Sequence, residues 1–495
     1  MPLGTQILKH KKMKKINFTV IFLLAVLLIP SCAVNPVTGR RQLMFMTERQ
    51  EIRLGAEYDP QVIAAFGLYE NESLLALIEE KGTEMGLLSH RPDLEYHFRI
   101  LDSPVINAFA VPGGYIYFTR GILAQFNNEA EMIGVLGHEM GHITARHTAS
   151  RQTMQQLGQI LLIGGMIASE EFRRYAQYAA AGMELLFLSF SREDERESDR
   201  LGVEYASKLG YDASEMANFF EVLQKMNLAH EQAGIPTFLS THPDPGDRYE
   251  SVKLDAEKWQ QELGYTEWEV NREGYLQLLE GMVFGEDPRQ GYTDGQTFYH
   301  PDLRFQFPFP EGWELENSPL QVRIGPPERN ALMIFSIAQQ RSLDEAASAA
   351  IQQLELNVLE SDRTTVNGMP AIAVLSNHQS TDQGGQVQTL QVLSYFIEYD
   401  GRYYVFHGVS NEAIFNRNRP LFELTMTNFD RLTDASRINV QPQRIRIRQV
   451  QRDGTFAEAL RSFGVDQENM ERFAFLNNRL LNDQVRAGEL IKIAE

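Results

Sequence analysis

Two histidines four residues apart constrain the fold of this chain more than any other feature of its 495 residues. His138, Glu139 and His142 form the pattern HExxH, and residues four apart on an α-helix lie on the same side of it. Both imidazoles can then donate a nitrogen atom to the same Zn²⁺ ion. Glu139 lies beside the first of them without binding the metal, which suits a general base. The motif therefore predicts a helix with one Zn²⁺ per chain.

The residues around this motif favour a helix. Asn127 or Asn128 can cap its start, apolar residues follow at helical spacing, and we expect the helix to run to about Ala149. Arg146 should lie on the same side as the two ligands and pair with an acid near the site, whereas His147 should point away as a structural residue. Three glycines lower the helix propensity but let another element approach closely: Gly134, Gly137 and Gly141.

A catalytic zinc site needs a third protein ligand and an open position. The single cysteine of the chain is Cys32, which excludes cysteine-rich metal sites and disulfides within the chain. Acidic residues are concentrated in residues 191–202, where a charged helix face in solvent is the ordinary interpretation. Glu195 and Asp199 lie four residues apart there, so one helix can present both carboxylates to the same site.

Together these residues resemble the pattern of the HExxH metallopeptidases that include the CAAX prenyl endopeptidase, HtpX and BepA. In that family HExxH is followed on a later helix by ExxAD, and the matching residues here run from Glu195 to Asp199 with Ser198 in place of alanine. The resemblance implies that Glu195 is the third zinc ligand. It also implies that Asp199 donates a proton or stabilises the transition state, and that the chain is a zinc-dependent endopeptidase.

The resemblance covers about residues 32–262, roughly half of the chain. Residues 107–121 look like the family's strand bordering the active-site cleft, and an edge strand can bind an extended peptide. Residues 241–248 resemble the family's histidine loop. Taken alone, His242 in this loop would be interpreted as a surface residue. With the resemblance, we expect it to face the zinc, either as a hydrogen-bond donor to the developing oxyanion or as a ligand of the open position in a resting state.

The N-terminus predicts export. A basic cluster at residues 9–15 is followed by an apolar run at 18–29, which is typical of a signal peptide and too short to span a bilayer. Residues 29–32 resemble a bacterial lipobox ending at Cys32, and a plain signal peptide with an incidental cysteine is the alternative. By resemblance to Gram-negative lipoproteins, the alanine after Cys32 favours the periplasmic side of the outer membrane. Residues 33–47 would then be a tether, and the lipid would be the one contact with the membrane.

The net charge of −20 argues against nucleic acid as a partner, because nothing would attract phosphates. By analogy with the family, the expected substrates are unfolded or misassembled envelope proteins. The last 50 or so residues resemble a divergent LysM module, which implies glycan binding and peptidoglycan as a second partner. A small adaptor domain is the alternative interpretation of that segment.

The length requires several domains. We predict an α+β fold: a mainly helical zincin-type metallopeptidase domain with a small edge-strand sheet, an α+β domain of unknown role, and a small C-terminal module. Two further helices are expected, one buried at 157–169 and one from Leu343 to about Leu359. The expected units are a signal peptide with a lipobox (1–32), the metallopeptidase domain (33–285), the α+β domain (290–432) and the LysM-like module (437–495).

These features predict an envelope endopeptidase that acts in protein quality control. The alternative is a non-proteolytic lipoprotein for envelope assembly or glycan binding, whose zinc site is gated or structural. Glu139 favours the endopeptidase, because a purely structural zinc site would not need a general base.

Overall fold

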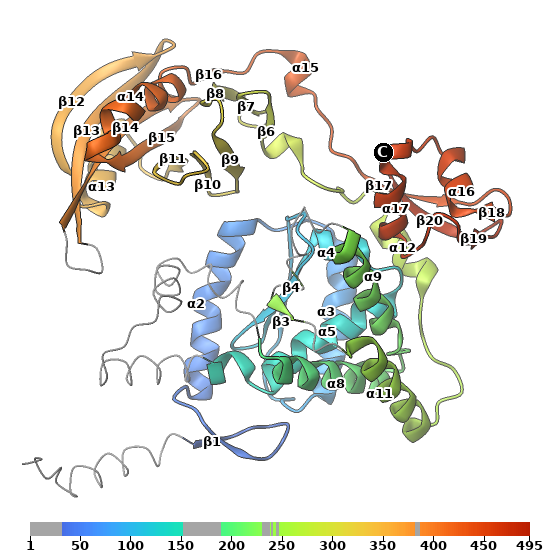
Figure 1. Ribbon diagram of the computed structural model, residues 1–495. Coiled ribbons are helices and arrows are strands. Elements are labelled where there is room, and N and C mark those ends of the chain that lie inside the picture. Colours follow the sequence, from blue (N-terminus) through green and yellow to red (C-terminus); the bar gives the residue numbers. More distant parts are fainter. Residues whose placement is uncertain (1–31, 152–189, 230–237, 239–240, 244–246, 382–386) are drawn as a thin grey trace, which may run out of the picture.

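The computed structural model describes residues 32–151, 190–229, 238, 241–243, 247–381 and 387–495, and it shows an α+β protein (Figure 1). The expected signal peptide up to Ser31 and the expected helix at 157–169 lie outside these described residues. None of the helices within the described ranges combines the length and the apolar character that crossing a bilayer requires.

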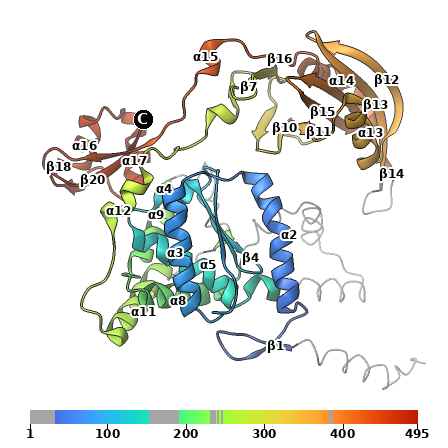
Figure 2. The same cartoon turned by 180° about the vertical axis from the view of Figure 1, so that it is seen from behind.

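A small sheet with helices on both faces forms the centre of the first part of the chain. Its strands β3 (His97–Leu101), β5 (Tyr115–Thr119) and β4 (Ala108–Val111) lie in this order. Strand β5 pairs parallel with β3 and antiparallel with β4, so β4 lies at an edge. Helix α2 (Glu48–Phe66) packs on one face of the sheet, and α3 (Glu72–Leu88) packs on the other (Figures 1 and 2).

Helix α5 (Glu129–Thr144) carries the HExxH motif and is buried along its whole length. The Asn128 side chain accepts a hydrogen bond from the Glu131 amide at 2.8 Å and so caps the start of the helix. The helix ends at Thr144, not near Ala149 as predicted, because Arg146 adopts a left-handed conformation with φ of 59° and starts a new turn.

Helices α8 (Arg192–Lys208), α9 (Glu215–Ala229) and α12 (Arg272–Leu279) contact α5, and α11 (Arg248–Leu263) packs on α8 and α9. Ser191 caps α8 through a capping box with Asp194. Helices α5 and α8 touch through glycines, because a Cβ atom at Gly137 would lie only 2.9 Å from the Cα atom of Gly202. This close approach brings the side chains of both helices to one place.

The segment that we expected to be a tether folds back on the end of α5. Strands β1 (Cys32–Val34) and β2 (Arg41–Leu43) form a hairpin, and the Asn35 amide donates a hydrogen bond to the Ala145 carbonyl at 3.3 Å. Arg146 forms a 2.9 Å ion pair with the buried Glu51 of α2. The acid that pairs with Arg146 therefore lies on the N-terminal helix and not among the residues around the HExxH histidines.

The middle of the chain has its own two apolar cores. A seven-stranded antiparallel sheet has α13 (Leu343–Gln353) on one face and α14 (Glu412–Met426) on the other. The prediction that the helix from Leu343 reaches Leu359 is wrong: Glu355 has a φ of 50°, and β12 begins at Asn357. The sheet strands in spatial order are β12 (Asn357–Val366), β13 (Met369–Thr381), β14 (Val387–Tyr399), β15 (Arg402–Asn411), β11 (Ala331–Ala338), β10 (Gln321–Gly325) and β9 (Glu314–Asn317).

A four-stranded sheet adjoins this unit. In spatial order its strands are β16 (Asp430–Arg431), β8 (Phe305–Pro308), β7 (Thr297–His300) and β6 (Tyr292–Asp294). The aromatic rings of Phe298, Phe305 and Phe307 from β7 and β8 belong to the same core as α14. The two sheets therefore share one apolar interior.

The C-terminal module, residues 437–495, packs against the first part of the chain (Figures 1 and 2). Its apolar residues Ile445, Phe473 and Ile493 belong to the same core cluster as Leu279 of α12. Lys492 is fully buried, and its ammonium donates hydrogen bonds to three carbonyls at the end of α4 (Arg120–Gln125). The elements of the module are β17 (Ile445–Gln449), β18 (Gly454–Thr455), α16 (Phe456–Ser462), α17 (Met470–Leu476), β19 (Gln484–Val485) and β20 (Leu490–Ala494).

Candidate metal centre

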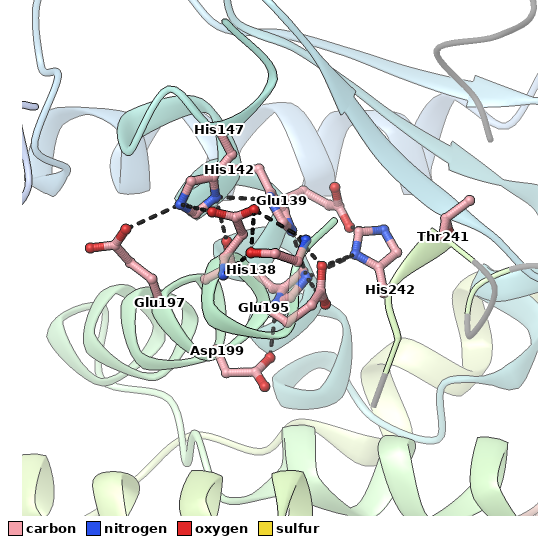
Figure 3. Close-up of polar contacts among 12 residues, drawn as sticks. His138, Glu139, His142, His147, Glu195, Glu197, Asp199, Thr241 and His242 are labelled. Carbon is pink, nitrogen blue, oxygen red and sulfur yellow. Dashed lines mark hydrogen bonds and ion pairs between the residues drawn. The ribbon is translucent and has the colours of Figure 1, made fainter. Parts of the chain in front are cut away.

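Four buried side chains from three segments direct potential metal donors at one point (Figure 3). Helix α5 supplies His138 and His142, α8 supplies Glu195, and the segment before α11 supplies His242. The Nε2 atoms of the two α5 histidines lie 3.1 Å apart. The Nδ1 atom of His242 lies 3.2 Å from His138 Nε2 and 3.2 Å from Glu195 Oε1.

These separations fit a zinc ion. Four ligands in a tetrahedron at about 2.0–2.1 Å from Zn²⁺ lie about 3.3–3.4 Å from one another. The donors of Glu195 lie 3.5 Å from the Nε2 atoms of both His138 and His142, and the histidine pairs are slightly closer. Glu195 Oε2 and His242 Nε2 have no hydrogen-bond partner among the described residues. A cation between the four side chains would satisfy the buried carboxylate.

The electrostatics also favour a metal. Burial lowers the pKa of His138 and of His142 well below its usual range, so both imidazoles are neutral and have free lone pairs. Burial alone would lower the pKa of His242 as well, but the carboxylates of Glu195 and Glu139 outweigh it and raise that pKa. His138 and His142 thus offer neutral nitrogen donors beside the carboxylate oxygens of Glu195, which is a ligand set found in catalytic zinc sites.

Asp199 and Arg248 hold the first histidine in place. His138 Nδ1 lies 2.9 Å from Asp199 Oδ1, which orients the ring so that Nε2 faces the other donors. The Arg248 guanidinium binds Asp199 through both Nε and Nη2, at 2.8 and 2.7 Å. Burial raises the pKa of Asp199, and Arg248 opposes that shift. Arg248 also lies 3.3 Å from Glu195 Oε2, so one cation contacts the carboxylates of both Glu195 and Asp199.

His147 and Glu197 hold the second histidine, His142, in place. Because the helix breaks at Arg146, the Nδ1 atom of His147 comes within 3.1 Å of His142 Nδ1. His147 Nε2 lies 3.1 Å from Glu197 Oε2. The hydrogen bond from His147 lowers the pKa of Glu197, which keeps this carboxylate charged. Phe190 stacks on the ring of His142 at 3.9 Å and covers it.

Glu139 lies beside the metal donors without being one of them. Both of its carboxylate oxygens are buried, and neither has a hydrogen-bond partner among the described residues. Burial raises the pKa of Glu139 to about 7. A carboxylate with that pKa can take up and release a proton near neutral pH, as a general base must.

The segment carrying His242 joins the cluster to the edge strand. The Phe238 amide donates a hydrogen bond to the Ile106 carbonyl at 3.1 Å, just before β4 begins. The Thr241 hydroxyl lies 3.4 Å from Asn107 Oδ1, and the next residue, His242, reaches Glu195 (Figure 3). The start of β4 and the metal donors are thus one short segment apart.

Comparison with known proteins agrees with this geometry. Residues 73–255 match the model of Peptidase family M48, and this range contains all four candidate ligands and Glu139. We refer to this part of the chain, after that match, as the M48 domain. The cofactor of M48 metallopeptidases is zinc, for which the four donors of the site have a suitable arrangement.

Several curated proteins are similar to part of this chain. The beta-barrel assembly-enhancing protease of Yersinia pestis is 28% identical over 239 residues, which cover 46% of this chain and 48% of the relative. The Escherichia coli K12 protein of the same name is 30% identical over 219 residues, 42% of this chain and 44% of the relative. Human mitochondrial metalloendopeptidase OMA1 is 27% identical over 236 residues, 44% of each chain. This chain thus spans less than half of the length of these relatives.

The structure brings all six residues singled out in the sequence to one place: His138, Glu139, His142, Glu195, Asp199 and His242. It adds Arg248, His147 and Glu197, which the sequence did not assign to the site. Arg248 ends the loop at 241–248, so its position in that motif was the available signal. No signal indicated His147, since an unbroken helix would have turned it away from His142.

Proposed function

We propose that the protein is a zinc-dependent endopeptidase of the bacterial cell envelope. The observation that carries the proposal is the buried carboxyl of Glu139, which lies 3.5 Å from His242 at the edge of a cluster with the donor set of a catalytic zinc. An M48 match over residues 73–255 and relatives named as proteases support it.

Each residue has a distinct task in this proposal. Zn²⁺ supplies a Lewis acid that polarises the scissile carbonyl and acidifies a water molecule. His138, His142 and Glu195 hold the metal, and Asp199 with Arg248 fixes the ring of His138. Glu139 takes the proton of the attacking water and passes it towards the leaving amine. Burial raises the pKa of Asp199, and in this proposal Asp199 donates a proton or stabilises the transition state.

His242 fills the fourth position in a resting state. Its Nδ1 atom lies 3.2 Å from both His138 Nε2 and Glu195 Oε1, the separation expected of a fourth ligand. A substrate carbonyl therefore has no room at that position. The proposal therefore requires the segment around His242 to move before catalysis. This same feature favours the alternative function, a non-proteolytic assembly or glycan-binding lipoprotein with a gated or structural zinc site.

The proposed setting is the periplasm, with an outer-membrane anchor at Cys32 and a signal peptide before it. The substrates we propose are unfolded or misassembled envelope proteins, which is consistent with relatives named for β-barrel assembly. We also propose that the C-terminal module is LysM-like and binds peptidoglycan. Its strand, two helices and closing strand support that assignment.

The Glu139→Gln variant tests the proposed activity. Glutamine keeps the shape of the side chain but cannot accept the proton, so cleavage of denatured casein should fall about 100- to 10,000-fold. Zinc content, measured by mass spectrometry of the metal, should stay at one ion per chain because Glu139 is not a ligand.

The matched control is Glu193→Gln, which changes a glutamate that is 88% exposed on α8. It should cleave casein like the wild type. A wild-type protein that binds zinc but never cleaves unfolded proteins would instead support the alternative function.

A further inference from the structure

The turn that ends α5 has a backbone conformation that is uncommon for the residue it contains. Arg146 has a φ of 59°, a left-handed conformation that glycine adopts freely at the end of a helix and that other residues adopt at a cost. The Arg146 amide donates a hydrogen bond to the Ile143 carbonyl at 3.1 Å, and the Ser150 amide donates one to the Arg146 carbonyl at 3.0 Å. The contacts of the arginine side chain must offset the cost of this conformation.

Those contacts come from the N-terminal segment. The Nε atom of Arg146 donates to Glu51 Oε2 at 2.9 Å, and its Nη2 atom donates to the Met46 carbonyl at 3.1 Å. Glu51 is only 1% exposed, and its other oxygen, Oε1, accepts a 2.8 Å hydrogen bond from Arg91. Arg91 in turn donates to the Ile143 carbonyl at 3.1 Å. The carboxylate of Glu51 is therefore held at both oxygens, and it fixes the guanidinium of Arg146.

The turn at Arg146 determines where His147 lies. On an unbroken helix, a residue five positions after His142 would point about 140° away from it. Here the Nδ1 atoms of the two rings lie 3.1 Å apart, and His147 Nε2 lies 3.1 Å from Glu197 (Figure 3). A neutral His142 that offers Nε2 to a metal carries its proton on Nδ1 and can donate it in a hydrogen bond to His147. This acceptor stays in place only while Arg146 keeps its left-handed conformation.

We propose that Glu51 is a positioning residue of the zinc site. It holds Arg146 in the conformation that brings His147 against His142, and so it strengthens zinc binding without touching the metal. The proposal rests on the zinc site of the proposed function and concerns the regulation of that site. Release of the N-terminal segment from Arg146 would weaken zinc binding, which gives this segment control over the metal centre.

Two substitutions of Arg146 test the role of the backbone conformation. Arg146→Ala and Arg146→Gly both remove the guanidinium and leave Glu51 its pair with Arg91, but glycine adopts a φ near 59° freely and alanine does not. We expect alanine to weaken zinc binding about tenfold, because His142 loses its acceptor, and glycine to retain nearly the wild-type affinity. If the ion pair served stability alone, both folded variants would bind zinc like the wild type.

Glu51→Gln tests the acid directly. Glutamine has a similar length but lacks the charge that holds Arg146, so zinc affinity should fall about tenfold. Adding Arg146→Gly to this variant should restore the affinity, because glycine needs no partner to keep the turn. The matched control is Glu48→Gln, which makes the same change on the same helix. Glu48 is 64% exposed and pairs with Arg91 at 2.8 Å, and its variant should bind zinc like the wild type.

Zinc affinity is measured by titration of the intact protein against a chromophoric chelator, with circular dichroism to establish that each variant is folded. The visible spectrum of the cobalt(II)-substituted protein is a second readout, because it depends on the geometry of the ligands. It should change in Arg146→Ala and stay unchanged in Arg146→Gly.

The proposal is overturned if Arg146→Ala and Arg146→Gly bind zinc equally well, or if Glu51→Gln and Glu48→Gln do. These readouts need no peptidase activity. A wild type that binds zinc but cleaves no protein would therefore overturn the endopeptidase function alone, whereas a wild type that binds no zinc would overturn both proposals.

Discussion

Glu193 and Glu195 lie two residues apart on α8, but one is exposed to solvent and the other is buried. Glu195 is fully buried among the histidines of α5, whereas 88% of the Glu193 side chain is exposed. The difference follows from the helical period, which turns Glu195 and Asp199 to the same side and Glu193 away. At the scale of single residues, spacing along a helix is therefore a strong guide to which side chains can share a site.

The zinc content of two variants tests the assignment of Glu195. Glu195→Gln removes the one anionic donor of the proposed ligand set, so we expect at least a tenfold loss of zinc affinity. Glu193→Gln should retain one zinc per chain. Metal analysis after dialysis against a weak chelator measures both proteins. Full retention of zinc by Glu195→Gln would show that another group supplies the third ligand.

The spacing of residues along one helix does not predict which residues from other parts of the chain lie at the site. Arg248 is 49 residues from Asp199, and its two hydrogen bonds to that carboxylate depend on how α11 packs against α8. His147 reaches His142 only because Arg146 has a positive φ, which is uncommon for a residue other than glycine. Neither the packing of two distant helices nor an uncommon backbone angle can be inferred from the local pattern.

The ends of helices could be predicted where the sequence contains a capping residue. The Asn128 cap and the apolar spacing correctly placed the start of α5, while its end at Thr144 was missed because no glycine or proline marks it. The same reason explains α13, which ends at Gln353 without such a residue. The hairpin of β1 and β2 was also missed, since a short polar segment with few apolar residues is typical of a tether.

The glycines of α5 and α8 allow a test of helix contact. Gly137→Ala adds a methyl group 2.9 Å from the backbone of Gly202, and backbone atoms cannot move aside as a flexible side chain can. We expect a loss of about 1–3 kcal/mol in stability, reduced by the better helix propensity of alanine, and weaker zinc binding. Thermal unfolding and metal titration measure the two effects.

Gly202→Ala provides a second measurement of the same contact, because its Cβ atom would lie 2.9 Å from the amide nitrogen of His138. The two variants should therefore behave alike. If both keep the stability and the zinc affinity of the wild type, the tight packing of α5 on α8 does not position the metal donors.

At the scale of the whole molecule, the C-terminal module was expected as a unit of its own, and its core is continuous with that of the M48 domain. Lys492 adds hydrogen bonds to the apolar contacts between the two parts. Its hydrogen bonds to the carbonyls of Ala124, Gln125 and Phe126 measure 2.8, 3.1 and 2.8 Å. Three acceptors need three N–H donors, which only the protonated ammonium has, although burial lowers the pKa of Lys492. More than 360 residues separate the partners, so no local pattern could reveal this contact.

Lys492→Met tests whether the module and the M48 domain unfold together. Methionine fills the space but leaves the three carbonyls without a donor and removes one of the two cations that act on Glu131, so we expect a loss of about 3 kcal/mol at pH 8 by calorimetry. Burial raises the pKa of Glu131, on which Lys492, Arg272 and Glu215 also act. A folded-state pKa above the unfolded value means that stability falls as pH rises, and without Lys492 that pKa rises further. The loss should therefore be smaller at pH 5, where Glu131 is protonated.

Lys258→Met, at a side chain 72% exposed on α11, should change stability by less than about 0.5 kcal/mol at either pH. Equal losses in the two variants would show that the module is not held by this buried ammonium.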